Sequence, residues 1–119
     1  MAQPFLPEDL EIMPKKHLCP ICETLRLLNG KWDLVVIRYL LEGPKRFAEL
    51  KDAIPDLSSK SLSATLKQLA TKKMIKRDVN PSSPVSVVYS LTARGSEMKA
   101  VIEAVRHWGE KWIQTYEQD

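Results

Sequence analysis

Apolar positions in the middle of the chain predict three consecutive helices. The stretch KWDLVVIRYLLEG, which begins at Lys31, is apolar almost all round, as expected of a buried helix that ends at Gly43. A shorter helix from Phe47 should end before Pro55, because a proline disfavours helical backbone in the preceding residue. Ser58 is a favourable N-cap for a third helix, whose apolar residues share one face: Leu62, Leu66, Leu69 and Ala70. The last two helices, with a short turn between them, form the helix-turn-helix pattern.

The segments that follow have the alternation of β-strands. Residues 75–79 and 85–91 are rich in β-branched side chains, and the sequence NPSSP joins them. This pattern predicts a β-hairpin with a stiff tip. Three helices followed by a two-stranded hairpin, or wing, indicate a winged helix-turn-helix. The predicted fold is mainly α with a small β-hairpin wing, and thus of the α+β class.

The last part of the chain predicts one long helix capped by Thr92. Its apolar residues step by three or four over about 18 residues and are Met98, Val101, Val105, Trp108, Trp112 and Tyr116. Such a stripe is longer than a domain of this size can cover with its own core. We therefore expect Met98, Val101, Val105, Trp108 and Trp112 to lie in the interface of a homodimer, with His107 beside them.

The beginning of the chain divides into an arm and a short helix. Prolines punctuate residues 1–16, which predicts an N-terminal arm followed by a single domain over residues 17–119. Pro20 suits the first position of a helix, so Cys19 falls at the N-cap and the helix should run to about Leu28.

Composition narrows the class of protein. The 119 residues match one domain, and no apolar run is long enough to cross a membrane. The N-terminus lacks the pattern of a secretory signal, so we expect a cytoplasmic protein whose two cysteines are reduced. The net charge is only +3, but residues 57–77 contain six basic residues and no acidic ones. This local positive charge favours a nucleic-acid partner, and double-stranded DNA is the partner expected of the fold.

Several motifs in order along the chain resemble those of HxlR-type transcriptional regulators, which are small dimeric winged-helix DNA-binding proteins. The motifs are Cys19-Pro20, Gly30-Lys31-Trp32, GPKRFAEL at residues 43–50, SSKSL at residues 58–62, YSLT at residues 89–92 with Gly95, and Trp108-Gly109. The resemblance covers about residues 18–112. It implies a dimer whose N- and C-terminal helices form the interface, and paired recognition helices that bind a near-palindromic operator.

Helical periodicity then selects the residues expected to contact DNA. If the third central helix enters the major groove, its outward side chains meet base edges; these are Lys60, Ser61, Ala64, Lys67, Gln68 and Thr71. Ser59, Ser63 and Thr65 flank that surface and suit phosphate or water-mediated contacts. Arg46, which precedes the first helix of the motif, is expected to anchor a phosphate.

Two cysteines in the sequence HLCPIC leave more than one interpretation open. A thiol at a helix N-terminus faces unpaired N–H groups and the positive end of the helix dipole, so Cys19 is a candidate thiol sensor. Cys22 is a candidate resolving thiol. The family resemblance adds that the matching cysteine is, in some members, a site of oxidant or electrophile action. The alternative is that both cysteines only pack as small apolar residues.

Other function classes fit the sequence less well than DNA binding. The surroundings of Cys19 and Cys22 lack the βαβ pattern of thiol oxidoreductases, and the chain shows no catalytic triad or phosphate-binding loop, so we expect no enzyme activity and no cofactor. We predict no metal site. Zinc held by His17, Cys19 and Cys22 remains an alternative, although a closed site needs a fourth ligand. A winged helix that binds proteins without reading DNA is the other alternative.

Overall fold

The computed structural model describes residues 19–28, 30–82 and 84–118, with side chains through residue 113. The described residues divide into two units, one that ends at Gly30 and one that begins at Lys31. Within the first unit, α2 spans Pro20–Leu27, as the sequence predicts. Proline occupies its first turn, and Glu23 lies 3.8 Å from Arg26 in an ion pair on the same helix. The apolar side chains of Ile21 and Leu25, one helical turn apart, are exposed.

Three helices form the centre of the second unit, and their order confirms the predicted helix-turn-helix. They are α3 (Lys31–Leu40), α4 (Phe47–Ala53) and α5 (Ser59–Thr71). The Ser58 hydroxyl accepts a hydrogen bond from the Ser61 N–H at 3.1 Å and so caps α5. The buried apolar core combines residues of these helices with the turn between α4 and α5 and the residues after α5, namely Val36, Ile37, Leu40, Leu50, Ile54, Leu57, Leu62, Leu66, Leu69, Met74 and Ile75.

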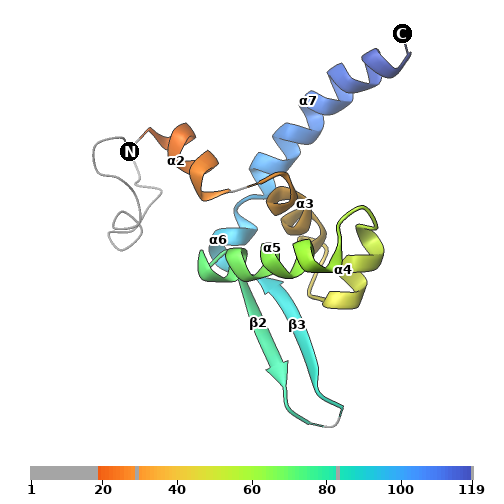
Figure 1. Cartoon of the computed structure of the whole chain (residues 1–119). Helices are drawn as coiled ribbons and strands as arrows, with labels where there is room; N and C mark the ends of the chain where they lie inside the picture. Colours follow the sequence, from red (N-terminus) through yellow and green to blue (C-terminus); the bar gives the residue numbers. More distant parts are fainter. Residues whose placement is uncertain (1–18, 29, 83, 119) are drawn as a thin grey trace. The chain divides into compact units, whose positions relative to one another are not determined.

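The sheet has three strands, one more than the predicted hairpin. The strands β1 (Lys45–Arg46), β2 (Ile75–Asn80) and β3 (Ser86–Leu91) are antiparallel in the order β1-β3-β2. Figure 1 shows β2 and β3 extending from the helical part of this unit. The two residues of β1 lie between Pro44 and α4, a stretch too short to produce a recognisable alternation. β1 pairs Lys45 with Tyr89 and thereby attaches the start of α4 to the wing.

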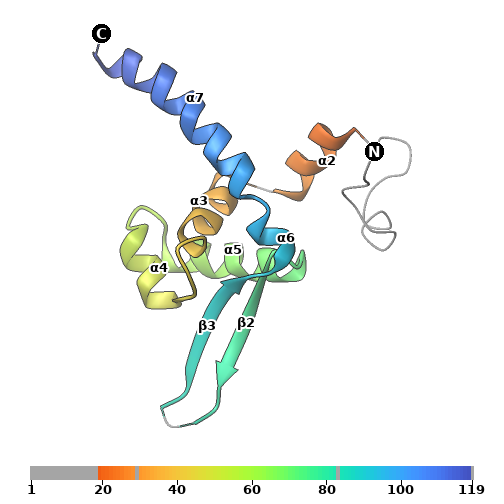
Figure 2. The same cartoon turned by 180° about the vertical axis from the view of Figure 1, so that it is seen from behind.

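The final helix begins later than predicted. Thr92 caps a four-residue helix, α6 (Ala93–Ser96), and the long helix α7 (Lys99–Gln118) starts after a turn, so the prediction of one continuous helix was wrong. Gly95 and Ser96 have low helix propensity, which favours the interruption. A Cβ at Gly95 would collide with the Met74 carbonyl oxygen, so the glycine permits α6 to lie against the turn between α5 and β2 (Figure 2).

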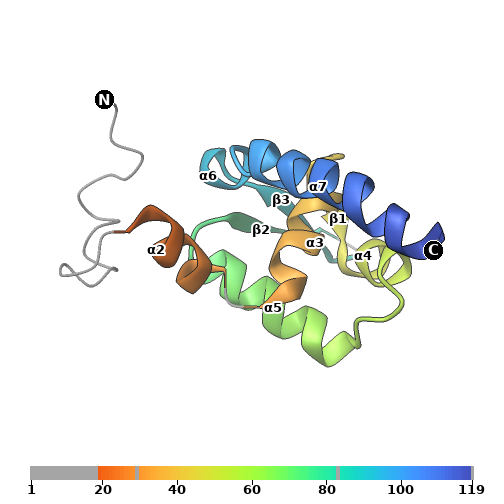
Figure 3. The ribbon, with the colours of Figure 1, turned by 90° about the horizontal axis from the view of Figure 1, so that it is seen from above.

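Side-chain hydrogen bonds hold this junction together. The Thr92 hydroxyl lies 2.6 Å from the Lys73 carbonyl oxygen, and Arg94 donates to the Lys72 carbonyl at 3.0 Å. These bonds connect α6 to the turn between α5 and β2. Figure 3 shows the first turns of α7 beside α3. In the part of the chain that the structure describes, no helix combines the length and apolar character needed to cross a membrane.

Candidate nucleic-acid interface

The outward surface of α5 carries the predicted DNA contacts. Burial of Leu62, Leu66 and Leu69 fixes the rotation of the helix about its axis. The opposite surface is exposed and consists of Ser59, Lys60, Ser61, Ser63, Ala64, Lys67, Gln68 and Thr71. Thr65 differs from the rest of the predicted set because it is half-buried. Arg46 is exposed on β1, and its N–H donates to Glu49 Oε1 at 2.8 Å at the start of α4.

The hydroxyl groups on this surface differ in what they can offer a ligand. The Thr71 hydroxyl donates to the Lys67 carbonyl oxygen at 2.9 Å, which uses its only hydrogen. Ser58 accepts a bond from the helix backbone at the other end of α5. Thr71 can therefore act toward a ligand only as an acceptor, whereas the two lysines, Lys60 and Lys67, provide donors and positive charge.

Positive charge continues from α5 into the strand that follows. Lys73 is exposed in the turn after α5, and Lys76 and Arg77 are exposed on β2. No acidic residue occurs between Leu57 and Arg77. DNA phosphates are attracted by such a surface without regard to base sequence, so the arrangement can supply affinity as well as recognition.

A notch between α5 and the wing adds two residues that the sequence prediction missed. Five residues of α5 line it on one side: Ser63, Leu66, Lys67, Ala70 and Thr71. Arg77 of β2 and Tyr89 of β3 line the other side, and the notch has a volume of about 330 Å³. The sequence showed Arg77 only as part of a basic run, and Tyr89 as a strand residue. Arg77 lies two residues after the core residue Ile75, and this spacing could have predicted that both side chains are on the same face of the strand.

The cysteines form a pair at the start of α2. Both are exposed, and the Cys19 sulfur accepts a hydrogen bond from the Cys22 N–H at 3.5 Å. This backbone bond, the Cys22 side chain and the Ile21 N–H together lower the pKa of the Cys19 thiol below its ordinary value. Hydrogen bonding to Cys19, followed by the charge of Cys19, raises the pKa of Cys22. The two thiols therefore differ in chemistry, since a larger fraction of Cys19 than of Cys22 is thiolate at a given pH.

The zinc alternative depends on a residue beyond the described part of the chain. His17 lies outside the described residues, so its position relative to Cys19 and Cys22 is not part of the structure. Among the described residues, no group of three or more His, Cys, Asp or Glu side chains could hold a metal ion.

The apolar stripe of α7 is largely uncovered. Trp108 is 61% exposed and Trp112 45% exposed, values that are high for tryptophan. Val101, Val105 and Ile113 are also exposed, while Met98 is half-buried and His107 exposed. Ile113 extends the stripe beyond the predicted set. Contiguous apolar surface of this kind is typical of protein interfaces.

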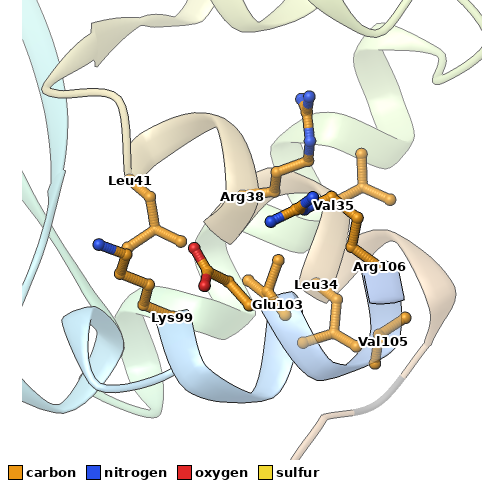
Figure 4. Close-up of a pocket in the computed structure, with 9 residues that line it drawn as sticks. Leu34, Val35, Arg38, Leu41, Lys99, Glu103, Val105 and Arg106 are labelled. Carbon is orange, nitrogen blue, oxygen red and sulfur yellow. The ribbon is translucent and has the colours of Figure 1, made fainter. Parts of the chain in front are cut away.

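A groove lies beside this stripe, between α3 and α7 (Figure 4). Its volume is about 390 Å³. Leu34, Val35 and Leu41 line it on one side, and Ile102 and Val105 on the other. Charged side chains surround the apolar floor, contributed by Arg38, Lys99, Glu103 and Arg106. Val105 belongs to both the groove and the stripe, so the two form a continuous apolar surface.

Comparison with known proteins supports a regulatory role. Residues 27–117 match the model of a family described as HxlR-like helix-turn-helix. The HTH-type transcriptional regulator sll1512 of Synechocystis sp. is 44% identical over 82% of this chain and 73% of its own length. The HTH-type transcriptional regulator YodB of Bacillus subtilis is 36% identical over 82% of this chain and 88% of its own.

Solved structures agree with the sequence comparison. The reduced form of YodB superimposes with a TM-score of 0.70 and 36% identity, over 81% of this chain and 95% of that one. The redox regulator HypR in its reduced form has a TM-score of 0.76 and 28% identity, over 84% of this chain and 99% of that one. The winged helix-turn-helix architecture predicted from the sequence is confirmed.

The contrast between the two thiols gives a first test. Each cysteine can be studied alone in a variant that replaces the other by serine. In Cys22→Ser, Cys19 keeps its backbone donors and has a serine hydroxyl beside it. The alkylation rate of Cys19 in this variant should therefore reach its plateau at a lower pH than the alkylation rate of Cys22 in Cys19→Ser. At about pH 7 Cys19 should react with iodoacetamide several-fold faster, because the thiolate is the nucleophile. Rates are measured by mass spectrometry over a pH series. Identical pH profiles for the two cysteines would contradict the assignment.

Proposed function

We propose, on the premise that this chain belongs to the HxlR-like helix-turn-helix family, that it binds a near-palindromic DNA operator as a homodimer and thereby regulates transcription. The observation that carries the proposal is the exposed, basic and acid-free surface of α5 beside the wing. The chain is a transcriptional regulator of the helix-turn-helix type, like its relatives sll1512 and YodB.

In this proposal α5 is the recognition helix and lies in the major groove. Lys60, Ser61, Ala64 and Gln68 then face base edges, while Ser59, near the start of the helix, suits a phosphate. An amide such as Gln68 can bind adenine in two places at once, and a lysine can serve the acceptors of guanine. Arg46 at the end of β1 is a further phosphate anchor, since it is exposed and precedes the first helix of the motif.

Dimerisation follows from the α7 stripe and from the symmetry of an operator. A two-fold axis repeats each apolar patch, so one stripe can cover its counterpart in a second copy. Burial of Trp108, Trp112 and Val105 would supply the apolar core of the interface. The exposed Ile21 and Leu25 of α2 offer a second apolar surface, which agrees with the expected role of the N-terminal helix.

Gln68→Ala tests base reading. Removal of the amide should weaken binding to an operator selected from a random DNA pool by about 1–3 kcal/mol and relax the base preference at one position in each half-site. Binding to a scrambled duplex of the same length should not change, because phosphate contacts are intact. Fluorescence anisotropy with both duplexes gives the comparison. Equal losses on both DNAs would remove Gln68 from the base-reading set.

Trp108→Asp tests the interface. A charge in the centre of the stripe should raise the dimer Kd by roughly thirtyfold or more, equivalent to at least about 2 kcal/mol. The matched control is Glu110→Gln, a change on the same helix at a residue that pairs with Arg106 at 3.2 Å on the surface. Sedimentation equilibrium measures both variants. A Trp108→Asp protein with the association of the wild type would place the interface elsewhere.

A second part of the proposal is that Cys19 makes operator binding sensitive to oxidants or electrophiles. Its exposure and the hydrogen bonds that lower its pKa favour this role. Two relatives support it: structures exist of YodB after diamide treatment and of HypR in an oxidised form. A peroxide would oxidise the Cys19 thiolate to a sulfenic acid, which can condense with the Cys22 thiol to a disulfide and release water. Diamide would give the same disulfide by another route: the Cys19 thiolate adds to its N=N bond, and the Cys22 thiol then displaces the reduced hydrazine. Because α2 is expected to contribute to the dimer interface, such a change would alter the spacing of the two recognition helices.

Cys19→Ser tests this sensitivity. Diamide should change the operator affinity of the wild type by about fivefold or more, the usual range of coupling between two sites, and should leave the variant unaffected. Cys22→Ser is the matched control and should keep Cys19 reactive while losing the intrachain disulfide. Anisotropy titrations are paired with intact mass measurements. An oxidant response that persists without Cys19 would end this part of the proposal.

A further inference from the structure

We propose that the notch between α5 and the wing holds one backbone phosphate of the bound DNA, contacted by Arg77, Lys67 and the Tyr89 hydroxyl. This inference rests on the proposed DNA binding and makes it more specific. It assigns a role to two residues outside the predicted set, Arg77 and Tyr89, and gives Lys67 a role different from base reading.

The register of the sheet brings the two strand residues together. Arg77 of β2 lies directly opposite Tyr89 of β3, and the neighbouring pair on the same face is Ile75 with Leu91. Directly opposed residues in an antiparallel pair point to the same side of the sheet. Because Ile75 is buried in the core, that side is the one covered by α5. Arg77 and Tyr89 thus continue the core-facing row outward to the edge of α5, where the notch opens.

The α5 side of the notch comes from one flank of the helix. Ser63, Lys67 and Ala70 succeed one another at spacings of four and three, so they lie in one row. This row borders the buried Leu66 on one side and the outward surface with Ala64 and Gln68 on the other. Lys67 therefore stands at the rim between the groove-facing surface and the wing.

The charge in the notch fits an anion. Among the described residues, no ion pair involves Lys67 or Arg77. Asp78, the nearest acidic residue in the sequence, alternates to the opposite face of β2. Lys45, which pairs with Tyr89 on its other side, already has Glu42 at 3.6 Å. Arg77, Lys67 and Tyr89, which carry a guanidinium, an ammonium and a phenolic hydroxyl, line a volume of about 330 Å³, which has room for a phosphate group.

The position of the notch favours a phosphate of DNA over one from a free metabolite. A helix in the major groove has a sugar-phosphate backbone along each side, so its flank faces phosphates while its outer surface faces bases. The notch lies on such a flank, and the wing forms its second wall. One phosphate held between helix and wing would fix the depth and rotation of α5 in the groove. The notch would in this way set the register in which Gln68 and Lys60 meet the bases.

Arg77→Ala is the central variant, and Lys76→Ala is its matched control. Both lose one exposed cation from β2, but Lys76 is on the opposite face of the strand. Binding to a random-sequence duplex weakens as salt is added, and the steepness of log K against log salt reports the number of phosphate contacts. This slope should become shallower by about 0.9 per subunit in Arg77→Ala and stay near the wild-type value in Lys76→Ala. Tyr89→Phe, which removes only a hydroxyl, should weaken binding about tenfold. Circular dichroism confirms that the variants fold.

Neutral methylphosphonates placed singly along the selected operator locate the phosphate. One position in each half-site should weaken wild-type binding but have little further effect in Arg77→Ala, because the variant has already lost that contact. Lys67→Ala should behave like Arg77→Ala and keep the base preference of the wild type. A changed base preference in Lys67→Ala with an unchanged salt slope would return Lys67 to base reading and overturn the proposal.

The remaining outcomes separate this inference from the proposed function. A wild-type protein that binds no duplex would refute DNA binding itself. A wild type that binds DNA, with Arg77→Ala equal to it in affinity and slope, would refute the notch alone. Titration with inorganic phosphate at constant ionic strength, observed through the NMR signals of Tyr89, examines the other source of phosphate. Phosphate binding that depends on Arg77, together with unaltered DNA binding in Arg77→Ala, would assign the notch to a free ligand and overturn the proposal.

Discussion

The burial of one leucine row on α5 is the constraint on which the remaining features depend. Leu62, Leu66 and Leu69 are buried, and the helix that carries them packs against α3 and β2. A helix anchored by three buried leucines cannot rotate without exposing them, at a cost of about 1.5–3 kcal/mol for each. The direction of every polar side chain on α5 is thereby fixed. The chemistry that the helix presents to a ligand is a consequence of its apolar side.

The same core also places the wing. Met74 and Ile75 are buried immediately after α5, so β2 leaves the helix in a fixed direction. Gly95 lets α6 approach the turn between α5 and β2 closely because it has no Cβ, and the hydrogen bonds of Thr92 and Arg94 hold α6 there. α7, which follows α6, is consequently connected through a few residues to the end of α5. A displacement of α7 would therefore reach α5 through a short, hydrogen-bonded connection.

Local signals explain which features the sequence could predict. Pro55 and Ser58 mark the end of one helix and the start of the next within four residues. The spacing of the leucines indicates the buried side of α5, and helical geometry then predicts which residues are exposed on the other side, apart from the half-buried Thr65. β1 could not be predicted because two residues are too few to show a period. The turn at residues 97–98 was missed because Met98, which lies in it, stands three residues before Val101 and so fits the spacing of the helix that follows. Arg77 and Tyr89 meet through strand pairing, which no local pattern of residues specifies.

The Cys19 sulfur both caps the start of α2 and is the reactive atom of the thiol. Sulfur accepts hydrogen bonds weakly, and serine is among the favoured residues at an N-cap, so a cysteine at this position gives up some helix stability in exchange for a reactive group. Any reagent that consumes the Cys19 thiolate also consumes the cap of the helix. Serine, the customary inert replacement for cysteine, would strengthen the start of α2, whereas alanine would leave it uncapped. The two substitutions are opposite perturbations of the same helix, and a chemical event at the sulfur is at the same time a change in where a helix begins.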